Sequence, residues 1–145
     1  MSAQADQQPS EPGPGVSPNP VRISARASRA TVRRLVDQDE FRSVCGMRRD
    51  LVGPAEDEPL LFHYMRIHDS RKHYHRKTIE YYYVVGGSGE MELDGEIVPV
   101  GAGDMIVVPT GVWHTSRPTT DEELHILICA LPQALDPGEV DSHYE

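Results

Sequence analysis

Long apolar runs are missing from this 145-residue chain: no segment approaches the ~20 consecutive apolar residues that a membrane-spanning helix needs. Cysteine is scarce too. Cys45 and Cys129 cannot build a disulfide framework, and we expect reduced thiols that pack as small hydrophobic groups. Cations are outnumbered, with 14 Lys and Arg against 23 Asp and Glu and a net charge of −9. Since nucleic acids are bound by clustered cations, we expect neither nucleic-acid nor membrane partners.

The N-terminal segment has few large apolar side chains. Residues 1–22 contain five prolines and cannot bury enough surface to offset chain entropy, so we predict a disordered Pro- and Gly-rich tail. The segment also lacks a basic region followed by an apolar one, so no secretory signal is predicted and we expect a cytoplasmic protein. A local cationic stretch follows, which we interpret as solvated surface: Arg22, Arg26, Arg29, Arg33 and Arg34.

The chain does contain a series of short β-forming runs, separated by Gly and Pro turns and accompanied by no convincing long helix. Asp94 and Gly95 lie between two such runs and provide the strongest hairpin signal in the chain. Short strands at this spacing predict an all-β sandwich or barrel. We expect strands over residues 45–52, 60–68, 79–85, 90–93, 97–100, 105–108 and 124–131.

These runs divide the chain beyond the tail into three parts. Residues 60–132 hold most of the predicted strands and are expected to form the core of the barrel. Residues 23–59 have apolar positions that suit strands or a short helix, packed on the barrel. Residues 133–145 offer little to pack, so we expect an extended or disordered C-terminal tail.

Three histidines and one glutamate stand out within the barrel region. His73 and His75 are two residues apart, so on one strand both imidazoles project to the same face. Glu80 follows at an odd separation, and we infer that residues 76–78 turn the chain so that a new strand returns Glu80 to the same interior. His114 arrives from far along the sequence, after a bend preset by Pro109 and Gly111.

These residues resemble the two motifs of the cupin superfamily, G-x5-H-x-H-x3,4-E-x6-G and G-x5-P-x-G-x2-H-x3-N. The first is matched by His73, His75, Glu80 and Gly87, with Ile67 in place of the opening glycine. The second is matched by Gly103, Pro109, Gly111 and His114, with Pro118 in place of the asparagine. The 15 residues between the motifs, 88–102, resemble the spacing of small single-domain cupins. The resemblance implies a double-stranded β-helix, or jelly-roll barrel.

Three neutral imidazoles and one carboxylate form a nitrogen-and-oxygen site that suits one divalent transition metal, Mn, Fe, Co, Ni or Zn. We expect His73, His75, Glu80 and His114 to be the ligands. In an octahedral shell they would leave two positions for water, dioxygen or a chelating substrate. Core histidines that hydrogen-bond in an empty barrel are the alternative.

Candidates for the surrounding pocket follow from strand parity. Tyr82 shares the parity of Glu80, His63 shares the interior face on the preceding strand, and Trp113 is next to a ligand and could wall the pocket mouth. One cation on a barrel strand could pair with a substrate carboxylate if it faces inside, and Arg66 is a candidate together with Arg48 and Arg49. The sequence leaves the facing of these arginines, and of His125, open.

Two function classes remain. The first is a metal-dependent enzyme, either a dioxygenase-like oxidoreductase or an isomerase or lyase, that acts on a small oxygen-rich molecule with Glu80 as the catalytic carboxylate. The second is a non-catalytic small-molecule-binding or sensing module, because one fold can host both. We also expect a homodimer, formed through outward side chains such as Tyr81, Tyr83 and residues 32–36.

Overall fold

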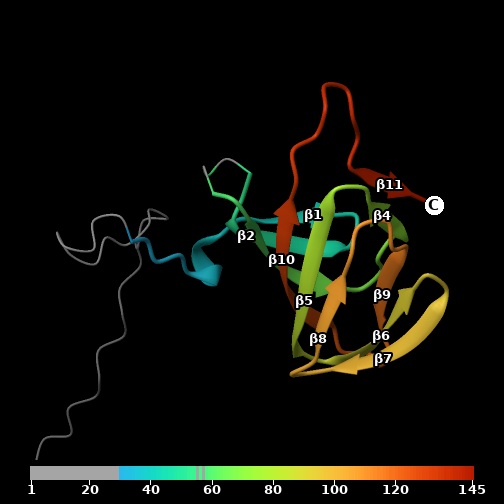
Figure 1. The fold of residues 1–145 in the computed structure, drawn as a ribbon. Helices are drawn as coiled ribbons and strands as arrows, with labels where there is room; N and C mark the ends of the chain where they lie inside the picture. Colours follow the sequence, from blue (N-terminus) through green and yellow to red (C-terminus); the bar gives the residue numbers. More distant parts are fainter. Residues whose placement is uncertain (1–29, 55, 57) are drawn as a thin grey trace, which may run out of the picture. The chain divides into compact units, whose positions relative to one another are not determined.

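Eleven strands and one 3-10 turn make up the part of the chain that the computed structural model describes, residues 30–54, 56 and 58–145 (Figure 1). The predicted tail over residues 1–22 lies outside this part, as do residues 23–29 of the next segment. No helix among the described residues is long and apolar enough to cross a membrane. The elements are η1 (Leu35–Asp37), β1 (Glu40–Ser43), β2 (Gly46–Val52), β3 (Leu61–Ile67), β4 (His73–His75), β5 (Thr78–Gly86), β6 (Ser88–Leu93), β7 (Glu96–Gly101), β8 (Met105–Val108), β9 (His114–Pro118), β10 (Leu124–Pro132) and β11 (Ser142–Tyr144).

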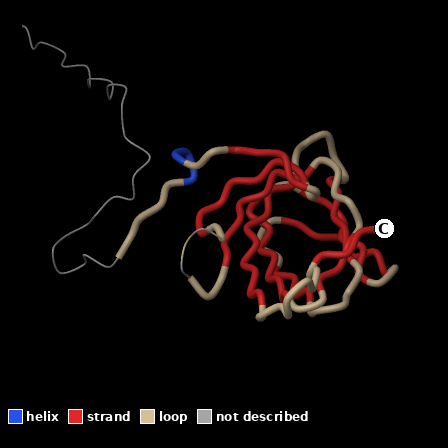
Figure 2. The backbone as a smooth tube through the Cα atoms, turned by 90° about the horizontal axis from the view of Figure 1, so that it is seen from above, coloured by secondary structure: helices blue, strands red, loops and turns tan. Residues whose placement is uncertain are grey.

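The strands form two antiparallel sheets. One sheet has the order β1-β2-β3-β10-β5-β8 and the other the order β11-β4-β9-β6-β7. Figure 2 shows from above how the strands are arranged around a common interior. Neighbours in each sheet are mostly far apart in sequence, as in a jelly roll, so the predicted all-β jelly-roll barrel is confirmed.

Alternation along the strands decides which side chains enter the interior. In β5, Thr78, Glu80, Tyr82 and Val84 are buried, whereas Tyr81 and the other odd-numbered residues between them are exposed or half-buried. This is the period of two expected of a strand with one face on a core and one outside. The buried hydrophobic core consists of Met65, Ile67, Tyr82, Val84, Met91, Val100, Val108, Leu124, Ile126 and Ile128.

Two turns show why particular residues stand in them. Asp94 and Gly95 both have positive φ, 49° and 89°, as the two-residue hairpin between β6 and β7 requires. Gly87, from the first motif, has φ 80°, and a Cβ there would lie 2.3 Å from the carbonyl oxygen of Glu123. A larger residue at Gly87 would therefore push β5 and β6 away from the start of β10.

The segments on either side of the barrel core add strands to both sheets. β1 and β2, from the segment expected to hold strands or a short helix, extend the six-stranded sheet, with β2 paired to β3. Residues 133–145, expected to be extended or disordered, include β11, which pairs with β4 beside the histidines. The C-terminal segment is therefore part of the wall of the site.

Candidate metal centre

The four expected ligands come from three strands of the two sheets. His73 and His75 lie on β4, Glu80 on β5 and His114 on β9, where it is directly opposite His73. Their ligand atoms all lie within 4.8 Å of one another. Atoms bound at ~2.1 Å to one ion can be at most about 4.2 Å apart, so a shift of a few tenths of an ångström would bring the set to bonding distance.

Backbone and hydroxyl groups decide which nitrogen of each imidazole faces the centre. His73 Nδ1 lies 2.8 Å from the carbonyl oxygen of Arg71, and His114 Nδ1 lies 2.9 Å from that of Val112. A carbonyl only accepts, so both Nδ1 atoms carry the proton and both Nε2 atoms present a lone pair. His75 Nδ1 is 3.0 Å from the hydroxyl of Ser142, so the Nε2 of His75 also faces the centre of the cluster.

Two of these nitrogens are left without partners. The Nε2 atoms of His75 and His114 are buried and form no hydrogen bond to any described residue. Each lies 3.3 Å from Glu80 Oε2, outside hydrogen-bonding geometry. A buried polar atom without a partner costs about 1–3 kcal/mol, which a bound cation would offset. The donor set therefore fits a divalent metal, and core histidines with full hydrogen bonding do not describe this cluster.

The electrostatics of the cluster favour an ionised carboxylate at Glu80 and a neutral imidazole at His73. Burial opposes ionisation of Glu80, but the imidazoles of His114 and His75 beside it hold its pKa well below the usual range. Burial and the neighbouring His114 lower the pKa of His73 to about 4. For His75, burial is outweighed by Glu80, and its pKa is raised. At neutral pH the cluster therefore offers an ionised carboxylate oxygen and, at His73, an unprotonated nitrogen donor.

Tyr82 holds the carboxylate from the other side. Its hydroxyl donates a hydrogen bond of 2.9 Å to Glu80 Oε2. The side chain is buried, and burial raises the pKa of the phenol well above its ordinary value, so the proton stays on the hydroxyl. The hydrogen bond fixes the direction of Glu80 and makes its oxygen less basic.

The C-terminal segment supplies contacts that sequence reasoning missed. Asp141 Oδ2 lies 3.2 Å from His75 Nδ1 and accepts a hydrogen bond from Thr78 Oγ1, while Oδ1 accepts one from the backbone of Lys77. Partners of this kind orient a ligating imidazole and raise its basicity. The stretch around Asp141 has no recognisable motif, and only its pairing with β4 brings it to the centre.

A cavity of about 360 Å³ is lined by three of the four candidate ligands, His73, His75 and Glu80. His63 and Tyr82, both expected there, line it, together with Arg48, Cys45 and apolar side chains such as Ile128. Cys45 Sγ lies 4.0 Å from His73 Nε2, and burial raises the pKa of this thiol to about 11. Both cysteines are free, as expected.

Two other pocket candidates require correction. Arg66 points to the other face of β3, where it forms ion pairs with Glu40 and Glu123 at 2.7 and 2.8 Å. Trp113 packs edge-on against the ring of Tyr74, with 4.7 Å between the ring centroids. Alternation along β3 places Arg66 on the face opposite to that of His63. Trp113 directly precedes His114, so its side chain points away from the interior that His114 enters.

The facing of the remaining open residue is also settled. His125 Nδ1 lies 2.7 Å from the hydroxyl of Tyr64, and both side chains are half-buried on the outer face of the six-stranded sheet. This pair is therefore away from the metal-ligand cluster.

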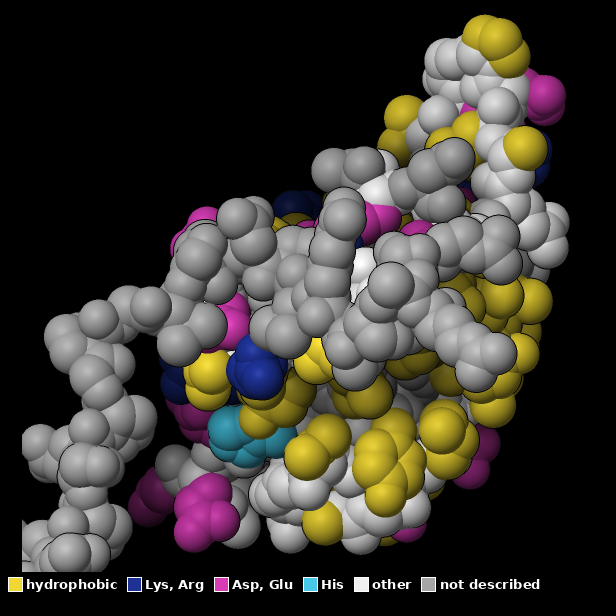
Figure 3. Space-filling model, turned by 90° about the vertical axis from the view of Figure 1, so that its left-hand side faces the viewer, with side chains coloured by type: hydrophobic (Ala, Val, Ile, Leu, Met, Phe, Trp, Pro, Cys, Tyr) yellow, Lys and Arg dark blue, Asp and Glu magenta, His cyan; other side chains and the backbone are white. Residues whose placement is uncertain are grey.

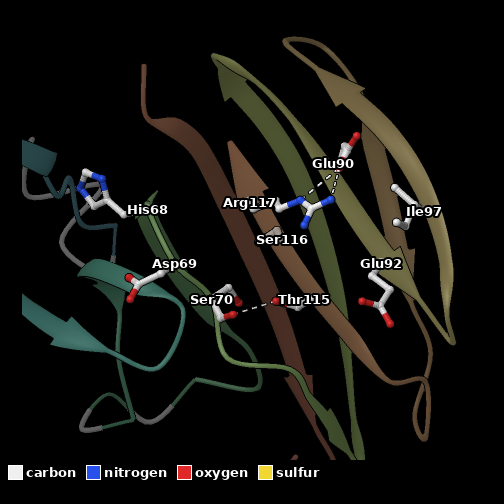
Figure 4. A pocket seen from close by; sticks show the side chains of 9 residues that line it. All are labelled: His68, Asp69, Ser70, Glu90, Glu92, Ile97, Thr115, Ser116 and Arg117. Carbon is white, nitrogen blue, oxygen red and sulfur yellow. Dashed lines mark hydrogen bonds and ion pairs between the residues drawn. The ribbon is translucent and has the colours of Figure 1, made fainter. Parts of the chain in front are cut away.

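A second pocket of about 390 Å³ lies on the outer side of the five-stranded sheet (Figure 4). Its polar groups are paired with one another: Arg117 donates two hydrogen bonds to Glu90, and Thr115 donates one to the carbonyl oxygen of Ser70. Lys72 bridges to Glu92 at 2.9 Å. We call this the outer pocket, and the cavity at Glu80 the inner pocket.

Comparison with known proteins gives a consistent family assignment for the core. Residues 61–130 match the family model described as the cupin domain. A stretch of 73 residues, 49% of this chain, is 37% identical to polyketide synthase CurC of Streptomyces cyaneus. The matched stretch spans about half the length of that relative, 47%.

Solved structures share the fold over more of the chain. A protein from Planctomyces limnophilus superposes with a TM-score of 0.68 at 25% identity, over 81% of this chain and 99% of that one. A predicted oxalate decarboxylase from Thermotoga maritima gives a TM-score of 0.64 at 23% identity, over 70% of this chain and 99% of that one.

Proposed function

The chain contains a cupin domain, and on that premise we propose that it is a metal-dependent enzyme acting on a small oxygen-rich molecule. His73, His75, Glu80 and His114 would hold one divalent ion of Mn, Fe, Co, Ni or Zn. The observation that carries the proposal is the pair of buried Nε2 atoms, on His75 and His114, that have no partner and converge on an ionised carboxylate. When bound, such an ion supplies Lewis-acid or redox activation at its open positions.

The protein's own residues have distinct tasks in this proposal. Glu80 is the catalytic carboxylate in this proposal, because it is the one carboxylate among the four residues, and a carboxylate can bind a cation and exchange a proton with a neighbouring oxygen acid. Tyr82 keeps Glu80 in place through its 2.9 Å hydrogen bond. Apolar side chains along the cavity, Met65 and Ile128 among them, exclude water from the substrate.

Two reaction types suit this arrangement, a dioxygenase-like oxidation and an isomerisation or elimination. The names of similar proteins support the search for oxygen-rich substrates, since one is a polyketide synthase and another a predicted oxalate decarboxylase. The alternative is a sensing module that binds such a molecule without turnover. Oxygen uptake during turnover distinguishes the first reaction type from the second, and turnover itself distinguishes both from the sensing module.

The test combines metal analysis with one conservative substitution. Purified protein, grown with added metals and assayed by elemental analysis, should hold about one divalent ion per chain. Glu80→Gln should keep most of that metal, because three imidazoles remain, yet lose turnover by ~10² or more, as when a positioned acid or base is removed. Glu90→Gln makes the same change in the outer pocket and should leave both quantities unchanged.

Two outcomes would contradict the proposal. The first is protein that holds no stoichiometric metal and gains none on reconstitution. The second is Glu80→Gln protein with bound metal and wild-type turnover, which would leave Glu80 as a ligand only.

We also propose that the protein is a homodimer. Large apolar side chains are exposed on the outer face of β5 and the edge strand β8: Tyr81, Tyr83, Val85, Met105 and Val107. Figure 3 shows hydrophobic side chains gathered on the face turned to the viewer. A patch of this kind at a sheet edge is typical of a contact with another chain. Sedimentation at micromolar concentration should give a mass of two chains. Tyr83→Lys should shift the measured mass towards that of one chain.

The expectations of a cytoplasmic location and of no nucleic-acid or membrane partner remain predictions. They rest on the net charge of −9 and on the composition of the chain. Localisation of a tagged full-length protein by fractionation tests the first of them.

A further inference from the structure

The wall of the inner pocket that β2 and β3 form carries a polar cluster of three side chains. Asp50 on β2 is directly opposite His63 on β3. Asp50 Oδ1 lies 2.9 Å from His63 Nδ1 and accepts a hydrogen bond of 2.5 Å from Arg48 Nε. One carboxylate oxygen therefore orients both the imidazole and the guanidinium.

The nitrogen atoms of His63 and Arg48 that Asp50 does not bind are available to the inner pocket. His63 and Arg48 both line it. Among the described residues, His63 Nε2 and the two terminal nitrogens of Arg48 have no hydrogen-bond partner. A pocket wall thus presents one acceptor beside two charged donors.

The protonation state of His63 defines what its Nε2 can do. Burial, followed by the charge of Arg48, lowers the pKa of His63, so the imidazole is neutral at neutral pH. The carboxylate of Asp50 only accepts, so the single proton lies on Nδ1 and Nε2 carries a lone pair. Nε2 can accept a hydrogen bond from a hydroxyl group in the cavity.

Arg48 complements this acceptor. Its guanidinium carbon lies 5.5 Å from the ring centroid of Phe41, a contact that limits the rotation of the side chain. With Nε committed to Asp50, its two terminal nitrogens form the fork that binds a carboxylate bidentately.

A structural ion pair that merely joins neighbouring strand residues is the simpler interpretation. It explains the contact between Arg48 and Asp50, but it does not require a histidine that is only 6% exposed to face a cavity with a free nitrogen. Arg66 on the outer face shows the contrast, because its Nε and both terminal nitrogens bind Glu40 and Glu123.

The distance between this cluster and the metal ligands suits one small molecule. His63 and Tyr82 are both opposite Ile128, on either side of β10. Strands in a sheet are about 4.8 Å apart, so β3 and β5 are separated by roughly 10 Å. Apolar side chains, including Met65 and Ile128, lie between the two polar regions.

We propose that Arg48 and His63, oriented by Asp50, form a second subsite that binds the carboxylate and an adjacent hydroxyl of a hydroxy acid with an apolar body. The subsite deepens the proposed function, since the rest of that molecule would extend towards Glu80. Arg48 binds the carboxylate, and His63 Nε2 accepts a hydrogen bond from the hydroxyl group.

The experiment measures binding of three matched probes to metal-loaded protein by isothermal titration calorimetry. The probes are mandelate, 1-phenylethane-1,2-diol, which lacks the carboxylate, and phenylacetate, which lacks the hydroxyl. Wild-type protein should bind mandelate most tightly. Arg48→Gln should weaken mandelate tenfold or more and the diol less than twofold, because a charged hydrogen-bonding group contributes at least one factor of ten.

Further variants separate the subsite from general damage. Arg48→Lys keeps the charge without the fork and should give an intermediate affinity for mandelate. His63→Phe should reduce the preference for mandelate over phenylacetate, while Arg117→Gln, which removes a cation from the outer pocket, should change none of the three affinities. Metal content and melting temperature of each variant show that it is folded.

Three results would overturn the inference: equal binding of mandelate and the diol, Arg48→Gln protein with wild-type affinity for mandelate, or an equal loss in Arg117→Gln. These results are distinguishable from failure of the proposed function, which would appear as protein without bound metal. Repeating the titration on chelator-treated protein keeps the subsite testable in that case, because Arg48 and His63 are not metal ligands here.

Discussion

The metal-ligand cluster and the outer pocket lie on the two sides of one strand. β9 turns His114 and Ser116 to the inside and Thr115 and Arg117 to the outside. Both pockets contain acidic and basic groups and have similar volumes, about 360 and 390 Å³. In the outer pocket each charge has a partner, as Arg117 has in Glu90, whereas in the inner pocket two buried nitrogens have none.

This difference shows which polar residues carry chemistry. A charge that is 65% exposed, like the Arg117 side chain, costs little to leave in water and gains little from its partner. A buried imidazole nitrogen without a hydrogen bond costs free energy in the folded state, so its presence indicates a ligand that restores the loss. The site is recognised by buried polar atoms that have no hydrogen-bond partner. The number of charged residues does not identify it.

The largest effect should come from removing one inner imidazole and, in parallel, one outer cation. His114→Ala should weaken binding of Zn²⁺ or Mn²⁺ by 10² or more, because one of the four ligands is lost. Arg117→Ala should bind the same metals as wild type does. Competition against a chromogenic chelator measures both. Equal affinities for the two variants would break the comparison.

Acid should destabilise the metal-free protein through the inner cluster. The pKa of His73 is about 4 in the fold and about 6.5 in an unfolded chain, so between these values only the unfolded state binds the proton. Stability present above pH 6.5 is then lost as pH falls to 4, by roughly 1–3 kcal/mol. The lowered pKa of His63 acts in the same direction. The raised pKa of His75 gives stability that is fully present below pH 6.5 and is lost only as pH rises above that value, so it does not change the slope within this window.

Urea unfolding of metal-free protein at pH 7, 6, 5 and 4 measures this loss. His73→Gln removes the buried imidazole and should flatten the profile over that range. A variant profile as steep as that of wild type would assign the acid sensitivity elsewhere.

A smaller effect is expected from the C-terminal segment. Asp141→Asn keeps the shape of the side chain but weakens its attraction to His75 Nδ1, 3.2 Å away. Metal affinity should fall about tenfold, the lower end of what loss of an orienting partner costs. Asp136→Asn, in the exposed loop before β11, is the matched control and should have no effect. Chelator competition gives both values, and an unchanged affinity in Asp141→Asn would show that Ser142 alone positions the imidazole.

The smallest effect should come from the outer ion pair. A double-mutant cycle with Glu90→Gln and Arg117→Ala should give a coupling free energy below about 0.5 kcal/mol, since exposed pairs are screened by water and salt. Thermal unfolding of the four proteins provides it. A coupling of 2 kcal/mol would place this pair in the same energetic class as the inner cluster.

Much of the centre could be predicted before the structure. The spacing of His73 and His75 and the turn before Glu80 are local features, because the two-residue period of a strand decides which of its side chains share a face. The break at residues 76–77 between β4 and β5 confirms that reading. The hairpin at Asp94 and Gly95 was predictable for the same reason, since positive φ depends on the residues themselves.

The facing of the arginines could not be predicted in this way. Parity says that Arg48 and Arg49 point to opposite faces of β2, but which face is inside depends on the pairing of β2 with β3, where Asp50 meets His63 and a bulge follows. Arg66 and Trp113 do not line the inner pocket: Arg66 pairs with Glu40, and Trp113 packs against Tyr74.

By itself, the sequence determined the all-β class, the shared face of His73 and His75 and the turns between strands, because each depends on local alternation or on backbone preferences. His114 was expected beside them from its place in the second cupin motif. The tertiary structure alone decided that β11 returns to β4 and brings Asp141 to His75, and that Asp50 joins Arg48 to His63 in the inner pocket. The physical reason is that these contacts are long-range. Their free energy comes from strand pairing and shared burial, which no local pattern of residues encodes.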